Sequence, residues 1–262
     1  MTRGLRDIAG EAILLAGGGR AILLQIAHPA VGRGVAEHSD FASRPLDRLH
    51  ATMTYVYAVV YGTDTEIAEV RRRVNLAHAP VHDGPAGTGP AYNAFDPDLQ
   101  LWVAATLYQT AVDLYQRIFG PFDEESAERI YREYGVLGTS LQVPAGAWPK
   151  DRAAFSDYWN GVLPTLQATD ATRRVAKDLL RPRSVPLWLK AVMPLARLMT
   201  VGLLPEPLRA GFGLAMTERN ERRFRRWLRI MAAVFPRLPA RIRHSMRDHE
   251  LDTLRRSLRQ AQ

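Results

Sequence analysis

Residues 96–121, DPDLQLWVAATLYQTAVDLYQRIFGP, contain the clearest helix of the sequence and decide its fold class. Asp96 can cap free backbone amides, and Pro97 suits the first helical position, where no internal hydrogen bond is lost. The helix continues until Gly120-Pro121 ends it. Apolar residues recur at helical spacing through most of the remaining chain, whereas strand-like runs between turns are scarce. The sequence therefore predicts an all-α fold.

Two helices are predicted before this segment, and they should pack as neighbours because a short connection joins them. Residues 45–61 are followed by Gly62, a residue typical of helix C-termini. The next helix begins near Thr63, and Pro80 ends or kinks it. One face of this second helix carries side chains spaced by three and four, namely Ile67, Val70, Val74, His78 and Val81.

Further helices are predicted in the rest of the chain. They span residues 124–137, 151–168, 169–180, 186–198, 218–234 and 240–258. No repeat or linker divides them, so residues 1–262 are predicted to form a single domain.

Composition excludes several kinds of site. The chain has 262 residues, 47% of them hydrophobic, which is enough to bury a substantial core. It has no cysteine, which excludes disulfides, a thiolate nucleophile, a zinc–thiolate site, an iron–sulfur cluster and thiolate-ligated haem. Any metal must therefore be bound by His, Asp, Glu, Tyr or Met.

No secretory or membrane-spanning segment is predicted. Asp7 and Glu11 interrupt the only stretch near the N-terminus that could form the apolar region of a signal peptide. The most apolar late stretch, residues 185–204, contains Lys190 and Pro194 and does not reach the ~18 uninterrupted apolar residues of a span. We expect a cytoplasmic protein.

Positive charge is concentrated in the C-terminal third. Residues 171–262 carry 21 Lys/Arg and 7 Asp/Glu, in a chain whose net charge is +8. Such charges either form a solvated helix face or bind a partner. In the basic helical region at about 217–262, five arginines accompany Trp227 and Leu228, namely Arg219, Arg222, Arg223, Arg226 and Arg229. Peripheral contact with an anionic membrane is the partner hypothesis for this region, and no nucleic acid is expected.

Histidines are the strongest candidates for metal ligands, and His78 is the first among them. It falls on the apolar face of its predicted helix, where a neutral ring needs either a hydrogen-bond partner or a metal. Because Pro80 has no amide hydrogen, the carbonyl of Leu76 could accept a proton from His78 and fix the tautomer for ligation. His82, four residues on, is the alternative ligand. The proline between the two rings and the absence of an HExxH pattern argue against a zinc hydrolase.

Arg48 and Thr52 are four residues apart and share one helix face. In a pocket of low dielectric, this pair could bind a propionate, polarise dioxygen or orient a substrate. The alternative is a surface arginine beside a threonine bonded to its own helix. The spacing alone leaves both open.

Two further elements are ambiguous. Gly17 to Gly19 precede Arg20 but lack the lysine and Ser/Thr of a phosphate loop, so nucleotide binding has little support. His28, followed by Pro29, breaks an apolar helix, and a further short helix leads to His38. Both histidines are candidates for structural pivots, and His28 is equally a candidate for a pocket residue.

Several of these features occur in one order: GEAILLAGGGRAILLQIAHPAVGRGVAEHSDF at 10–41, the spacing of Arg48 and Thr52, HAPVHDG at 78–84 and GPAYNAFDPDLQLWV at 89–103. This series resembles the domain shared by rubber oxygenase (latex clearing protein) and the MpaB-type oxygenases. The resemblance covers about residues 8–215 and is most specific between residues 11 and 103.

The resemblance implies a globin-related helical bundle that binds haem b through its iron. The proximal histidine of the family matches His78, with Arg48 and Thr52 matching its partners on the distal side of the haem. His28 matches a recurrent AHP element and is a further cofactor-binding candidate, whereas the role of His38 is unspecified.

One position departs from the family's pattern. Ala51 stands where rubber oxygenase has a lysine just before the threonine, so a lysine-capped resting iron is not expected. We therefore expect a haem b-dependent oxygenase that uses dioxygen on a small apolar substrate such as an isoprenoid or a lipid. Because no secretion signal is predicted, polymeric rubber is not the expected substrate. The alternative is a non-catalytic protein that binds haem or a hydrophobic ligand.

Overall fold

The computed structural model describes residues 2–38, 45–83, 91–182 and 186–260, and its regular structure there is helical. The described residues form no β-strand, and a single isolated antiparallel bridge joins His82 to Asn93. The predicted all-α class is confirmed.

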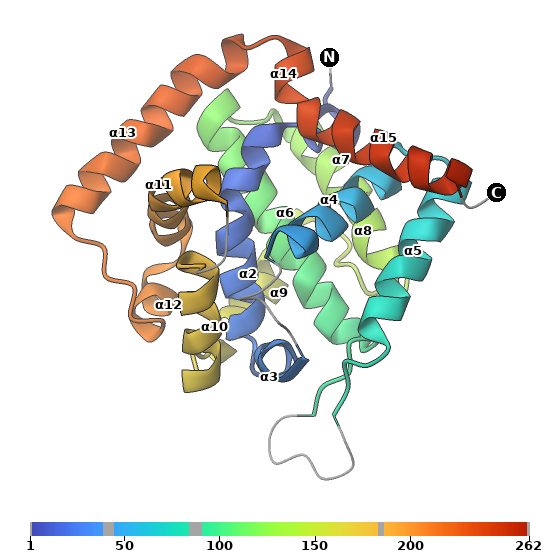
Figure 1. The fold of residues 1–262 in the computed structure, drawn as a ribbon, viewed down its shortest axis with the longest axis horizontal. Coiled ribbons are helices and arrows are strands. Elements are labelled where there is room, and N and C mark those ends of the chain that lie inside the picture. Colours follow the sequence, from blue (N-terminus) through green and yellow to red (C-terminus); the bar gives the residue numbers. More distant parts are fainter. Residues whose placement is uncertain (1, 39–44, 84–90, 183–185, 261–262) are drawn as a thin grey trace.

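Helices α2 and α6 occupy the centre of the molecule, and the other helices surround them (Figure 1). Near the N-terminus lie α1 (Leu5–Ile8), the 3-10 helix Ala12–Gly17, α2 (Gly18–Ala27) and α3 (Pro29–His38). The middle of the chain forms α4 (Pro45–Tyr61), α5 (Asp64–His78), α6 (Pro97–Phe119), α7 (Glu124–Tyr134), α8 (Val136–Thr139), α9 (Arg152–Val162) and α10 (Asp170–Leu180). The last third forms α11 (Leu187–Leu203), α12 (Glu206–Gly211), α13 (Glu218–Val234), α14 (Ala240–Arg243) and α15 (Ser245–Gln260).

The central helix α6 begins and ends as its sequence predicts. The Asp96 carboxylate accepts hydrogen bonds from the amides of Asp98 and Leu99 at 2.8 and 3.3 Å. Gly120 ends the helix with φ of +93°, a conformation that favours glycine. Trp102 on this helix is buried and donates from its indole nitrogen to the carbonyl of Leu24 at 3.2 Å. This bond joins α6 to α2.

An aromatic cluster fills the core between α6, α7 and α9. The Tyr108 and Phe155 rings meet edge-on at 4.9 Å, and Tyr131 stacks on Trp148 at 5.4 Å. Trp159 extends the cluster by stacking on Trp102 at 5.2 Å. The cluster therefore runs from α7 and α9 to the central helix, and such rings contribute a large part of the buried apolar area.

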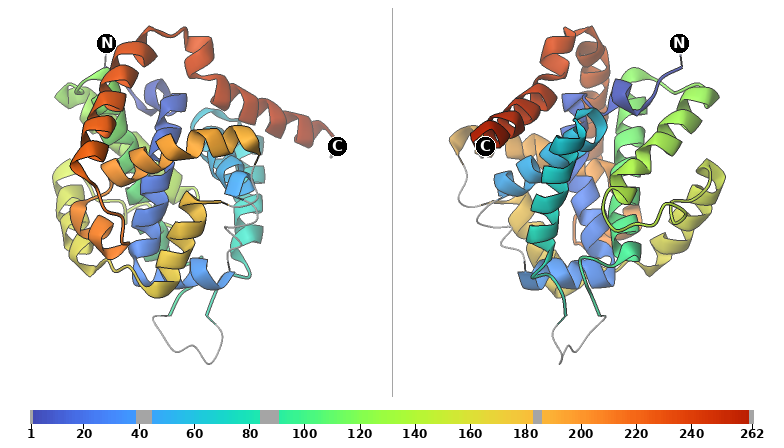
Figure 2. Two further views of the ribbon diagram at one scale, coloured as in Figure 1. Left: turned by 60° about the vertical axis from the view of Figure 1, so that its left-hand side comes forward. Right: turned by 90° about the vertical axis from the view of Figure 1, so that its right-hand side faces the viewer.

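A second hydrophobic cluster joins α6 to the C-terminal helices. It is formed by Ile13, Leu114, Ile118, Met199, Leu203 and Phe224. Gly202 lets the Phe224 ring pack directly on α11, since a Cβ added at this glycine would lie 2.4 Å from the ring. The helices α11 and α13 are thus packed on the body, and Figure 2 shows both along one side of it.

Most predicted helices are present, and the differences have local causes. The prediction for 218–234 is confirmed by α13, whereas 124–137 is divided at Gly135, on which Trp148 packs so closely that a Cβ would lie 3.0 Å from its ring. The helix expected over 151–168 ends at Val162, where a short 3-10 turn begins at Leu163 with Pro164 as its second residue. The helix expected over 240–258 is divided at His244.

No single helix of the described residues is long and apolar enough to cross a bilayer. Two segments, Ala12–Ala27 and Pro29–His38, reach that length and composition only together, and they are bent by 105°.

Candidate functional site

His78 lies at the C-terminal end of α5 and is half-buried. The helix begins with a capping box in which Thr63 and Glu66 bind each other's backbone amides. It ends just before Pro80, as predicted, but Val81, which the spacing placed on the helix face, is outside the helix and donates to the carbonyl of His78 at 2.8 Å. Pro80 explains this end, since it has no amide hydrogen for a further helical turn.

The Nδ1 atom of His78 is buried without a hydrogen-bond partner among the described residues. Nδ1 therefore does not make the bond to the Leu76 carbonyl that the sequence suggested. The nearest ring is Phe95, edge-on at 6.3 Å. An unpartnered buried nitrogen is rare enough to need an explanation, and an absent ligand is one.

Arg48 lies in the first part of α4 and is exposed, and its charge acts on His78. Burial lowers the pKa of His78, and the Arg48 guanidinium lowers it further. Both effects favour the neutral imidazole, which is the form that binds a metal. The structure therefore brings these two predicted residues together, although they come from different helices.

Thr52 is exposed, and its hydroxyl donates to the carbonyl of Arg48 at 2.9 Å. This is the helix-bonded arrangement that the sequence left as the alternative. The threonine shares the helix face of Arg48, but its proton is engaged within its own helix.

His28 ends α2 at the break before α3 and is half-buried. Its Nδ1 is also buried without a described partner, and its ring lies 6.4 Å from that of Trp102. Burial lowers the pKa of His28, and Asp96 opposes that effect. His28 and His78 thus both lie near the beginning of α6, at Trp102 and Phe95 respectively.

His82 and His38 have ordinary partners. His82 is exposed, and its Nδ1 lies 3.2 Å from the carbonyl oxygen of Asp83. The Nε2 atom of His38 lies 2.7 Å from the hydroxyl of Tyr92, which donates to Glu37 at 2.7 Å. Unlike Nδ1 of His78 and of His28, the ring nitrogens named here have partners.

The described residues contain no group of three or more His, Cys, Asp or Glu side chains arranged to hold a metal ion. A haem iron needs only one protein side chain, because the porphyrin provides four nitrogen ligands. A single histidine with an unpartnered nitrogen and a favoured neutral form fits such a group.

Two aromatic neighbours of the site were not singled out from the sequence. Phe95 and Trp102 both fall within the quoted segment 89–103. Their aromatic side chains near the start of α6 are the sequence feature that could have indicated them. Three buried carboxylates were also not predicted to pair with residues far away in the sequence: Glu11 and Glu66 with the C-terminal segment, and Glu250, within that segment, with α4.

The chain matches the model of a family described as "ER-bound oxygenase mpaB/B'/Rubber oxygenase, catalytic domain" over residues 5–233. Two curated relatives, both called uncharacterized proteins, come from Mycobacterium tuberculosis and Mycobacterium bovis. Each is 37% identical over 212 residues, which covers 79% of this chain and 82% of the relative. No solved structure matches significantly, and the globin-related arrangement stays a prediction.

Proposed function

Because the chain belongs to the family of mpaB and rubber oxygenase catalytic domains, we propose that it is a haem b-dependent oxygenase whose iron is bound by His78. Membership supports an oxygenase, and hence an oxidoreductase. The observation that carries the haem assignment is the His78 ring, whose buried nitrogen has no partner among the described residues and whose neutral form is favoured.

In this proposal, haem would supply the redox chemistry with dioxygen, and the chain would bind and orient. His78 would hold the iron, with His28 as a second contact to the cofactor. Arg48, whose charge acts on His78, would suit a propionate or a polarised oxygen atom. Thr52 would assist only after its hydroxyl turns from the carbonyl of Arg48.

The substrate we propose is a small apolar molecule such as an isoprenoid or a lipid. Rubber oxygenase, which the family's description includes, is named for an apolar polymer of isoprene units. Discrimination among apolar substrates rests on pocket shape, because each methylene contributes only about 1–3 kcal/mol.

The decisive experiment is an absorption spectrum of freshly purified, unreconstituted protein. We expect a Soret band that is lost or shifted in His78→Ala and unchanged in the matched variant His82→Ala. Full haem content with an unchanged spectrum in His78→Ala would exclude His78 as the ligand. A shift in His82→Ala alone would transfer the assignment to His82.

The alternative is a protein that binds haem or a hydrophobic ligand without turning it over. The bond between the Thr52 hydroxyl and its own helix favours this alternative, since it leaves one presumed catalytic proton engaged. Oxygen consumption by haem-loaded protein with candidate isoprenoids separates the two. Consumption that requires both substrate and Arg48 supports the oxygenase, whereas none with any apolar substrate supports the binding protein.

We also propose that α13 contacts an anionic membrane. The helix buries Phe224 and exposes its other side, where Arg223, Trp227, Ile230 and Val234 follow one another at helical spacing. Exposed apolar groups between arginines are typical of helices that lie on anionic lipid. Co-sedimentation should therefore be stronger with anionic than with neutral liposomes.

Variants make this membrane test specific. Arg223→Glu together with Trp227→Ala should abolish co-sedimentation with anionic liposomes, while Arg71→Glu on exposed α5 should not. Equal binding of the wild type to neutral and anionic vesicles would exclude the proposed surface.

A further inference from the structure

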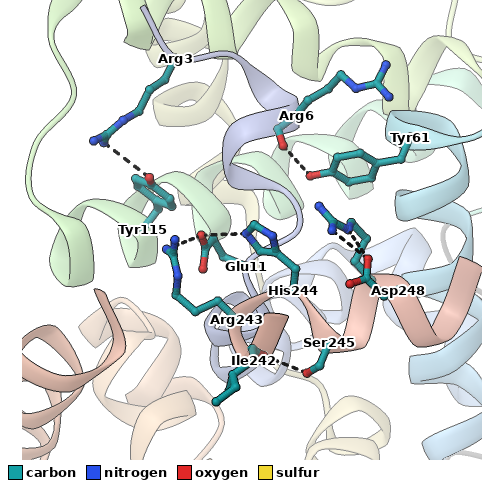
Figure 3. Close-up of polar contacts among 11 residues, drawn as sticks. Arg3, Arg6, Glu11, Tyr61, Tyr115, Ile242, Arg243, His244, Ser245 and Asp248 are labelled. Atoms are coloured by element: carbon teal, nitrogen blue, oxygen red, sulfur yellow. Dashed lines mark hydrogen bonds and ion pairs between the residues drawn. The ribbon is translucent and has the colours of Figure 1, made fainter. Parts of the chain in front are cut away.

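Three carboxylates are buried among the described residues, and each joins the C-terminal segment to the rest of the chain. Glu11, only 2% exposed, accepts a hydrogen bond from Arg243 at 2.6 Å and lies 3.2 Å from His244 (Figure 3). Burying a carboxylate is unfavourable unless it is paired. The segment 240–260 is therefore fixed to the body by buried charge.

The second carboxylate, Glu250, joins α15 to α4. It contacts Nδ1 of His50 and accepts from the Thr54 hydroxyl at 2.7 Å. These two partners are one helical turn apart on α4. In the sequence, His50 lies between Arg48 and Thr52, and Thr54 follows Thr52 by two residues. Two contacts one turn apart restrict both sliding and rotation of this part of α4 relative to α15.

The third carboxylate joins α15 to α5. Glu66, which also caps the beginning of α5, accepts from Arg255 at 2.7 Å. Farther along α5, Arg73 donates to the hydroxyl of Ser257 at 2.9 Å. Figure 1 shows α15 running across both α4 and α5. One helix therefore holds the helix of Arg48 and the helix of His78 at the same time.

We propose that α15 sets the position of α4 relative to α5, and that Glu250 is a positioning residue for Arg48 opposite His78. The functional part of this inference rests on the proposed function. The family model ends at residue 233, so α15 lies beyond the part of the chain that it matches. Apart from α15, α4 is held by its packing on α5, α8 and α1 and by bonds such as that from Tyr55 to the Leu137 carbonyl, which lie farther along the helix than Arg48.

The test measures the distance between α4 and α5. The chain contains no cysteine, so spin labels can be attached at Ala51→Cys and Arg72→Cys, both on exposed positions. Double electron–electron resonance should give one narrow distance distribution in this background. Adding Glu250→Gln should broaden or shift it, and so should Arg255→Met, which leaves the buried core unchanged. The matched control is Glu218→Gln, which breaks an exposed pair on α13.

A second measurement connects the distance to the cofactor. Transfer of haem to apomyoglobin should be about tenfold faster in Glu250→Gln. This is the lower end of the effect of mutating residues that support a metal site from outside its ligands. An unchanged distance distribution in both variants, with helix content retained, would overturn the positioning role. A changed distance in a protein that never holds haem would leave the positioning role standing and would reject the proposed function instead. Equal haem transfer despite a changed distance would remove the link between α15 and the site.

Discussion

Gly19 packs directly on Thr200: a Cβ added at this glycine would lie 2.1 Å from the Thr200 hydroxyl oxygen and 3.0 Å from its methyl group. The close approach brings α2 against α11. The middle of the three-glycine run, Gly18, has open space at the same position. A Cβ added at the first glycine, Gly17, would lie 2.6 Å from the Thr110 methyl group, so the run serves close packing at its two ends and not at Gly18.

We expect Gly19→Ala to lower the free energy of unfolding by about 1–3 kcal/mol, the usual effect of overpacking. Gly18→Ala should be neutral or stabilising by up to about 1 kcal/mol, because alanine is the better helix former. Urea denaturation of both variants measures the difference. Equal stability of the two would show that α2 and α11 adjust freely, and Thr200→Ala should partly restore Gly19→Ala.

Two buried tyrosines on α4 should respond in opposite directions to loss of the hydroxyl. Tyr55 donates to the carbonyl of Leu137 at 2.6 Å, whereas the Tyr57 hydroxyl is buried without a described partner. Tyr55→Phe should destabilise by about 1–3 kcal/mol because a buried carbonyl loses its donor. Tyr57→Phe should be neutral or stabilising. Thermal unfolding decides, and destabilisation of similar size in both would contradict the pairing.

Arg48→Met should raise the pKa of His78 in the haem-free protein, because the cation that opposes protonation is removed. The pKa should remain below the usual value for histidine, since burial, the larger cause, is unchanged. A titration of the ring protons by NMR measures it. Arg72→Met, on the exposed side of α5, is the matched control and should leave His78 unaffected. If the pKa of His78 fell or did not change after Arg48→Met, the guanidinium would not act on His78.

Stability of the haem-free protein should decrease as the pH falls below about 6.5, the ordinary pKa of histidine. Burial lowers the pKa of His78 and of His28, so the unfolded chain binds protons first. Stability from these groups is complete above their unfolded pKa and is lost as the pH falls towards the folded pKa. The unfolding free energy of His78→Gln should depend less on pH than that of the wild type. The variant of the exposed histidine, His82→Gln, should show the same pH dependence as the wild type.

Local patterns predicted the helices better than the contacts between them. The capping by Asp96 and the glycine at position 120 define α6 from a few adjacent residues, and the structure confirms both. The break at Gly135 was not predicted, because it depends on Trp148 packing on the glycine from a later turn. Burial of Glu66 likewise depends on Arg255, a residue 189 positions away.

The candidate site shows the same division. Family resemblance selected His78 and Arg48, and the structure adds their electrostatic coupling across two helices. The spacing of Arg48 and Thr52 predicted a shared face, but the bond that engages Thr52 depends on a side-chain rotation that spacing leaves open. The roles of these residues with haem stay predictions.

The five tryptophans divide into two environments: Trp102, Trp148 and Trp159 are buried, while Trp188 and Trp227 are 61% and 38% exposed. The molecule thus carries two sets of intrinsic fluorophores, one buried and one exposed. Emission from the inner three, one of them beside His28, should dim when an absorbing pigment enters nearby, and dissolved quenchers should reach the outer two first. A liposome that covers α13 should shield Trp227 from those quenchers, so one unlabelled sample can report pigment uptake and surface docking separately.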